Sequence, residues 1–223
     1  LFVSTFSTTF AQTPKTMKEL LQTYHFETKS VTLKDGELAY VKEGKGKKVL
    51  VFLHGLSSNS DAWYRNIEEL KKDYTCYAID LPGFGKSYKN APAFTPTYFA
   101  EVLNEFSEKM KLKKFTLVGH SMGGQAAVKF AALYPNKLKN LILVAPAGIE
   151  YFTEAEGNMM MMVTTKEGVM NTSDDQIDRN YAINFHEMPK EAASMIQDRK
   201  TIKNSSDFEA HAEAIVASIK GML

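Results

Sequence analysis

The sequence has little of what marks several other classes of protein. Its 223 residues include one cysteine, Cys76, which therefore cannot form an internal disulfide. No C-x-x-C, H-E-x-x-H or EF-hand pattern is present, so we expect no metal site and no cofactor. No apolar run reaches the roughly 18 residues of a membrane-spanning helix. The net charge of +1 gives no reason to expect nucleic acid or an anionic membrane as a partner.

The N-terminal stretch, Leu1 to Ala11, is apolar, rich in Ser and Thr, and free of charged residues. It resembles the end of a signal peptide, because Thr9-Phe10-Ala11 has the small-x-small form of a cleavage site. This interpretation predicts an exported protein, either periplasmic or secreted. A disordered leader is the alternative, and it predicts a cytoplasmic protein.

The rest of the chain is long enough for one domain with an inserted subdomain. Lys34-Asp35-Gly36 separates two alternating runs and predicts an antiparallel hairpin of residues 31–33 and 37–41. Three apolar runs predict buried strands, each followed by a helical pattern: 49–53, 76–79 and 115–118. The run 138–145 predicts a further strand. This alternation predicts an α/β fold with a mostly parallel sheet that helices cover on both faces.

The most informative stretch is Phe115 to Gly124, F-T-L-V-G-H-S-M-G-G. It predicts a strand, a sharp turn and a helix, with Ser121 in the turn and Gly119 and Gly123 on either side. Glycines leave no side chains to collide in such a turn, so the serine hydroxyl would stand at the carboxyl end of the sheet. The N–H groups at the start of the helix could then receive an anion. A glycine-rich turn with an incidental serine is the alternative.

The pattern changes after Ile149, where no further strand-like run occurs before Leu223. Segments 190–198 and 208–219 have Ala, Glu, Ile and Met at helical spacing, so we expect a small helical lid. Its methionines would either line an adaptable apolar pocket or fill irregular contacts between helices. The expected organisation is a leader and N-terminal arm, a core and a lid, with bounds 1–30, 31–149 and 150–223.

Three loops give the sequence a resemblance to the α/β-hydrolase fold family, in its serine esterase and lipase-like branch. His54-Gly55 is similar to the oxyanion motif of the family, 80–87 (D-L-P-G-F-G-K-S) to the loop after the following strand, and 119–124 to the nucleophile elbow. The resemblance implies that Ser121 is the nucleophile and that backbone N–H groups of Leu56 and Met122 form the oxyanion hole. It implies supporting roles for His54, Gly55, Gly119, His120 and Gly123.

A serine at this position implies an acyl-enzyme, and hydrolysis of a small carboxylic ester is the commonest reaction of that kind. Carbon–carbon bond hydrolysis of a diketone, cofactor-free haloperoxidase-like chemistry, and peptide or lactone cleavage would use the same residues. The sequence gives no indication of the oligomeric state.

The resemblance also implies a catalytic acid and then a histidine, each after a later strand. No such strand is predicted here, so we expect that the sequence is a fragment of a hydrolase of ordinary size, cut at both ends, in which the last strands are missing. Glu150 matches an alternative acid position. Other residues keep the required order of acid and histidine: Asp174, Asp175 or Asp178 followed by His186 or His211. A binding protein without a working triad is the competing functional class.

Overall fold

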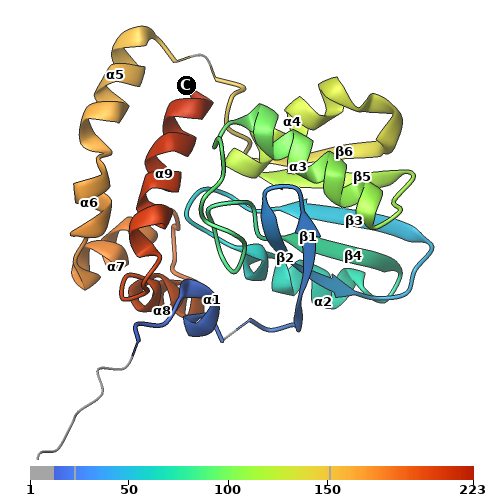
Figure 1. Cartoon of the computed structure of the whole chain (residues 1–223), viewed down its shortest axis with the longest axis horizontal. Coiled ribbons are helices and arrows are strands. Elements are labelled where there is room, and N and C mark those ends of the chain that lie inside the picture. The colour runs from blue at the N-terminus through green and yellow to red at the C-terminus, as the bar shows by residue number, and fades with distance from the viewer. Residues whose placement is uncertain (1–12, 23, 151) are drawn as a thin grey trace, which may run out of the picture.

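The computed structural model describes residues 13–22, 24–150 and 152–223. The predicted signal-peptide remnant, Leu1 to Ala11, lies outside these residues, so export stays a prediction. The described residues contain a six-stranded sheet with the order β1-β2-β4-β3-β5-β6 (Figure 1). The strands are β1 (Thr28–Leu33), β2 (Gly36–Glu43), β3 (Lys48–Leu53), β4 (Tyr74–Ile79), β5 (Phe115–His120) and β6 (Leu138–Val144).

The predicted hairpin is confirmed, since β1 and β2 pair antiparallel and Leu33 lies opposite Gly36. β1 begins at Thr28, three residues before the predicted start at Val31. β2 also pairs antiparallel with β4, whereas β3, β4, β5 and β6 pair in parallel. The mostly parallel sheet with an antiparallel N-terminal hairpin is therefore confirmed. Because parallel strands end at one edge, the loops after β3, β4 and β5 meet there.

Helices pack on both faces of the sheet. One face buries α3 (Pro96–Lys109) and α4 (Met122–Leu133), whose aromatic side chains share a core cluster with Val51 and Leu53 of β3. The opposite face packs Leu50 and Phe52 against η1 (Ser60–Trp63) and α2 (Tyr64–Leu70). A short turn, η2 (Pro135–Lys137), leads from α4 to β6. Thr95 caps α3 as predicted, its Oγ1 accepting from the Tyr98 N–H at 3.2 Å.

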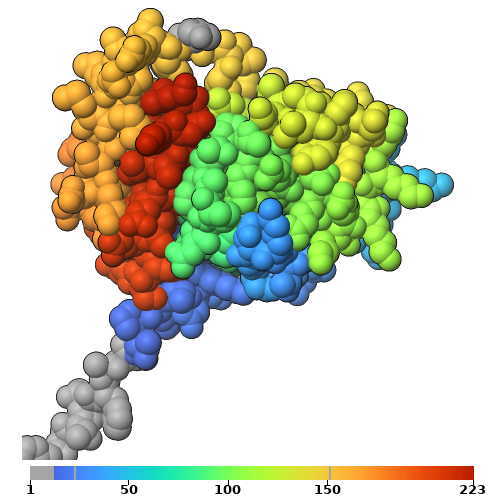
Figure 2. All heavy atoms as spheres, turned by 45° about the horizontal axis from the view of Figure 1, so that its top comes forward, coloured from blue at the N-terminus to red at the C-terminus, as the bar shows by residue number. Residues whose placement is uncertain are grey.

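After β6 the described residues form helices alone, which stand beside the sheet in Figure 1. We call residues 152–223 the C-terminal helical region. Within it, α9 lies against the core, and Ala214, Ile215 and Ile219 are buried in the main cluster (Figure 2). None of the described helices is long and apolar enough to cross a membrane. The helices are α5 (Glu154–Val163), α6 (Lys166–Met170), α7 (Asp174–Ala182), α8 (Ala192–Ile202) and α9 (Phe208–Met222).

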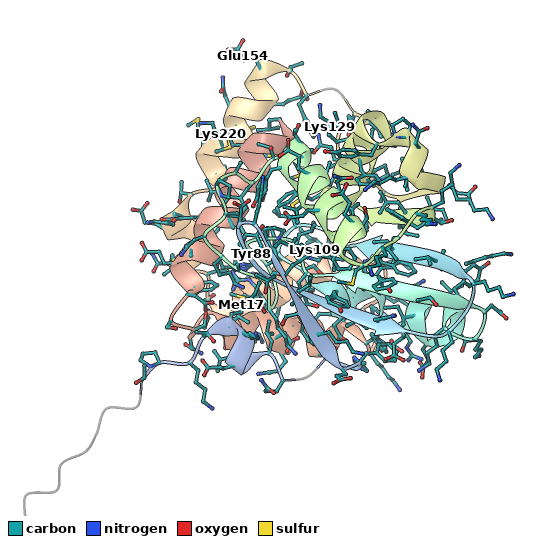
Figure 3. All side chains as sticks on the ribbon, turned by 45° about the vertical axis from the view of Figure 1, so that its right-hand side comes forward. Met17, Tyr88, Lys109, Lys129, Glu154 and Lys220 are labelled. Carbon is teal, nitrogen blue, oxygen red and sulfur yellow. The ribbon has the colours of Figure 1, made fainter. Side chains whose placement is uncertain are left out.

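The described part of the N-terminal arm packs against the C-terminal helical region. Its short helix α1 (Met17–Leu20) precedes Leu21, and Met17 and Leu21 are buried against Ile202 and Phe208. The Met17 N–H donates to Asp207 Oδ1 at 2.7 Å. Figure 3 shows Met17 on this helix beside the helices of that region. The described part of the arm is therefore built into the fold, a contact that the sequence did not predict.

Candidate active site

Ser121 lies in a sharp turn between β5 and α4, where its backbone has φ 51° and ψ −120°. This left-handed conformation is costly for a residue with a Cβ. Two hydrogen bonds hold it: the Ser121 N–H donates to Val144 O at 3.2 Å, and its own C=O accepts from the Ala147 N–H at 3.0 Å. The side chain is half-buried at the carboxyl end of β5. The predicted strand, turn and helix are thus present, and their geometry keeps the serine accessible.

The glycines beside Ser121 are needed for close backbone packing. A Cβ on Gly119 would lie 2.4 Å from Gly123 O, and one on Gly123 would lie 2.5 Å from His54 O. Gly124 has the same constraint, with Pro146 Cβ at 2.7 Å from such an atom. No side chain fits at these distances, so the turn packs backbone against backbone.

The loop after β3 lies directly against the serine. A Cβ on Gly55 would be 3.3 Å from Ser121 Cβ and 2.9 Å from His120 Nδ1. The Ser58 N–H donates to Gly55 O at 3.3 Å, which closes a turn around Leu56 and Ser57. Met122 begins α4, where the first N–H groups of a helix have no intrahelical acceptor. The loop that carries Leu56 and the start of α4, at Met122, therefore both adjoin Ser121.

The two histidines of these loops differ in environment. His54 is fully buried, and both ring nitrogens have partners: Nδ1 donates to Gly55 O at 2.7 Å, and Nε2 accepts from the Leu81 N–H at 3.0 Å. Burial lowers the pKa of His54. His120 is exposed on the rim of the turn, and partial desolvation of its ring lowers its pKa as well. The contacts of His54 hold the loops after β3 and β4 together.

Asp80, which directly follows β4, also joins the loops after β3 and β4. Its carboxylate is fully buried, with Oδ1 accepting from the Ser60 N–H at 2.7 Å and Oδ2 accepting from the Lys86 N–H at 2.7 Å. Oδ2 also accepts from the Tyr24 hydroxyl of the N-terminal arm at 3.0 Å, and burial raises the pKa of Tyr24 well above its usual range. The sequence motif marked this loop, but nothing in the sequence linked it to Tyr24, which lies 56 positions away.

The predicted acid positions are not brought to Ser121 by any hydrogen bond among the described residues. Glu150 is exposed in the loop after β6, and Asp175 is exposed on α7. Asp174 pairs with Lys203, and Asp178 pairs with Lys200 at 2.7 Å, so both carboxylates bind α8 or its end. The role of each stays a prediction.

The remaining histidines lie elsewhere in the described structure. His186 is exposed between α7 and α8, and His25 binds Asp61 through Nδ1 at 2.9 Å. His211 is buried on α9, with Nδ1 against Gly83 O at 2.8 Å. Within the described ranges, no hydrogen bond joins any of the five histidines of the chain to the Ser121 hydroxyl. The same part of the chain holds no group of three or more His, Cys, Asp or Glu side chains arranged for a metal.

Known proteins resemble this chain in sequence. Monoacylglycerol lipase ABHD6 of Homo sapiens is 33% identical over 138 residues, which cover 60% of this chain and 41% of the lipase. The 1-acylglycerol-3-phosphate O-acyltransferase ABHD5 of Rattus norvegicus is 37% identical over 108 residues, covering 46% of this chain and 30% of that protein. The matched stretches thus span less than half the length of these relatives.

Solved structures and a family model agree on the fold. A probable hydrolytic enzyme from Pseudomonas aeruginosa PAO1 superposes with a TM-score of 0.76 at 22% identity, covering 95% of this chain and 72% of that one. Residues 48–185 match the model of the α/β hydrolase fold, which is more than half of the sequence and includes the loops that converge on Ser121. The chain therefore belongs to the α/β-hydrolase fold family.

Proposed function

We propose that the protein is a serine hydrolase that cleaves a small carboxylic ester through an acyl-enzyme at Ser121. The observation that carries the proposal is the strained, half-buried turn that presents Ser121 beside the loop of Leu56. A costly conformation at an accessible nucleophile is typical of a functional site. Membership of the family and the similarity to monoacylglycerol lipase ABHD6 support a hydrolase.

The proposed reaction has two stages. Ser121 Oγ attacks the ester carbonyl carbon, and the tetrahedral oxyanion accepts hydrogen bonds from the N–H groups of Leu56 and Met122. Collapse expels the alcohol, which takes up the proton that the Ser121 hydroxyl lost on attack, and leaves an ester on Ser121. Water then attacks this ester in the same way and releases the acid. The proposal assigns no base among the described histidines, because none has a hydrogen bond with Ser121.

The substrate class follows from the relatives and from the C-terminal helical region. Both relatives are named for acylglycerols. Met160 and Met161 of α5 pack on the main core cluster, whereas Met159 and Met162 are exposed. We propose that this region acts as a lid over the site and that its methionines accept an apolar acyl chain. The substrate would then be an ester of a fatty acid with a small alcohol.

The test uses protein expressed from the complete reading frame of its source, treated with a fluorophosphonate probe and analysed by peptide mass spectrometry. We expect one label, on Ser121, and none in S121A. S194A is the control, because Ser194 donates to Glu191 O within α8 and has no place in the proposed reaction. Wild-type protein that takes no label would refute the serine hydrolase and favour the binding-protein alternative.

A substrate panel separates the remaining alternatives. Acyl nitrophenyl esters of increasing chain length, beside a diketone and a peroxidation assay, would be compared with wild-type protein and S121A. We expect ester cleavage that depends on Ser121. Faster turnover of the diketone would instead favour the carbon–carbon bond hydrolase.

A further inference from the structure

A small cavity lies where the N-terminal arm, the loop after β3 and the C-terminal helical region meet. Its volume is about 20 Å³. Polar side chains line it from both sides of the junction, and the lining includes Ser57, Asn59, Asp198, Arg199 and His211. Ser57 directly follows Leu56, so the cavity adjoins the loop of the proposed oxyanion hole.

His211 presents a hydrogen-bond acceptor to this cavity. Its side chain is only 1% exposed, and Nδ1 lies 2.8 Å from Gly83 O. A carbonyl oxygen can only accept, so Nδ1 carries the hydrogen and donates it. Burial lowers the pKa of His211 to about 3, which keeps the ring neutral. Nε2 then carries no hydrogen and can only accept a hydrogen bond, and it has no partner among the described residues.

Arg199 presents a donor to the same cavity. The residue is 9% exposed, and its guanidinium lies over the ring of Phe208 with 5.0 Å between its carbon and the ring centroid. The His211 ring packs on the same phenylalanine, with 5.8 Å between its centroid and that of Phe208. Arg199 Nη1 has no partner within the described structure. A guanidinium is protonated at any ordinary pH, so this nitrogen can only donate.

The size and chemistry of the cavity select its occupant. A volume of about 20 Å³ slightly exceeds the 10–15 Å³ or so that one water molecule requires. A simple anion would be repelled by the lone pair of His211 Nε2 and by the nearby Asp198. An ammonium group would be repelled by the positive charge of Arg199. A hydroxyl group suits both residues, since its oxygen can accept from Arg199 and its hydrogen can be donated to His211.

We propose that this cavity binds one hydroxyl group, which accepts a hydrogen bond from Arg199 Nη1 and donates one to His211 Nε2. Water is one source of the hydroxyl. The alcohol part of a polyol ester is the other, and this second source rests on the proposed function. Either occupant joins α8 and α9 to each other beside the loop of Leu56.

The test is nuclear magnetic resonance of protein labelled with ¹⁵N in histidine, because ring-nitrogen shifts report hydrogen bonding at Nε2. We expect the Nε2 of His211 to have the shift of a hydrogen-bonded acceptor and to move toward that of a free lone pair in R199M. R179M is the matched control, since Arg179 is exposed on α7. An Nε2 shift of a free lone pair both in wild-type protein alone and in wild-type protein with the unreactive ether 1-O-hexylglycerol would overturn the proposal. If R199M does not fold, high-resolution crystal structures of the wild type alone and with 1-O-hexylglycerol decide, because a cavity without a bound oxygen in both refutes the proposal and one bound oxygen in either supports it.

Two unreactive ethers distinguish the sources. 1-O-hexylglycerol carries hydroxyls and cannot be hydrolysed, and hexyl methyl ether lacks them. If the substrate supplies the hydroxyl, only 1-O-hexylglycerol shifts Nε2, and R199M weakens its binding by about tenfold or more. If water supplies it, neither ether shifts Nε2. A shift with both ethers would contradict hydroxyl binding. This readout needs no hydrolysis, so its failure is distinct from a failure of probe labelling at Ser121.

Discussion

The core and the C-terminal helical region achieve their structure by different means. Around Ser121, backbone packs on backbone, and a single added methyl group on Gly119 or Gly123 would collide with main-chain atoms. In the helical region, by contrast, exposed lysines such as Lys166 pair with carboxylates on neighbouring helices. The first arrangement fixes atoms within tenths of an ångström, and the second leaves helices room to adjust. The chemistry proposed at Ser121 needs the former, and the proposed lid needs only the latter.

The largest difference in stability between the two regions should come from adding one methyl group to a glycine in each. In G123A the new Cβ would meet His54 O at 2.5 Å, whereas in G157A, on α5, it would meet only Leu223 side-chain atoms, at 3.7 Å. We expect G123A to lose about 3 kcal/mol or more of unfolding free energy. G157A should gain up to about 1 kcal/mol from helix propensity. Urea denaturation measures both, and similar effects of the two changes would remove the contrast.

Acid should weaken the junction between the regions through His211. Its pKa of about 3 in the fold is depressed by burial, against about 6.5 when unfolded. The unfolded state therefore binds the extra proton, so stability is full above pH 6.5 and falls as the pH approaches 3. This one group should contribute a loss of about 2 kcal/mol between pH 6.5 and 5. In H211Q the loss of unfolding free energy between pH 6.5 and 5 should be smaller than in the wild type by this amount. Equal losses in H211Q and the wild type would contradict the prediction.

Strain in the core should be released by replacing Ser121 with glycine. The φ of 51° costs a residue with a Cβ roughly 1 kcal/mol, and glycine has no such cost. S121G should therefore unfold at a higher urea concentration than S121A, although neither takes the probe. A lower midpoint for S121G than for S121A would show that the turn stores no strain.

The smallest effect should come from the exposed pairs of the helical region. Lys166 binds Glu209 at 2.7 Å and Glu213 at 3.0 Å, which links α6 to α9 at the surface. Solvent and salt screen such pairs. We expect K166A to leave the urea midpoint unchanged within error at 0.15 M salt. A clear loss would mean that surface pairs, and not buried contacts, hold this region in place.

The sequence predicted the core well because its signals are local. Alternating apolar runs, the Asp-Gly turn and the cap at Thr95 all act over a few residues, so the strands and helices there match the prediction closely. The helices of the C-terminal region were predicted with less accurate bounds: segment 190–198 became α8, Ala192–Ile202. No side-chain hydrogen bond caps the start of α8 or α9, whereas Thr153, Thr165 and Ser173 cap α5, α6 and α7.

The site was predicted only in part, for the same reason. The glycines and Ser121 form one short motif, so their turn was visible in the sequence. The hydrogen bond of Tyr24 to Asp80 joins residues that are distant in sequence. Arg199 and His211 lie in separate helices and line one cavity only because those helices pack together. No periodicity or spacing carries that information. A deep polar junction between segments far apart in sequence has to be seen in three dimensions.

The docking of the N-terminal arm has a consequence for the order in which the chain folds. Met17 binds Asp207 across 190 positions, so a ribosome must make almost the whole described chain before α1 has its partner. The six strands of the sheet all precede residue 145, so the sheet can pair during synthesis while the arm waits undocked. Closing so long a loop is slow and entropically costly. Synthesis of residues near Asp207, rather than formation of the sheet, therefore sets when α1 and the helical region lock together.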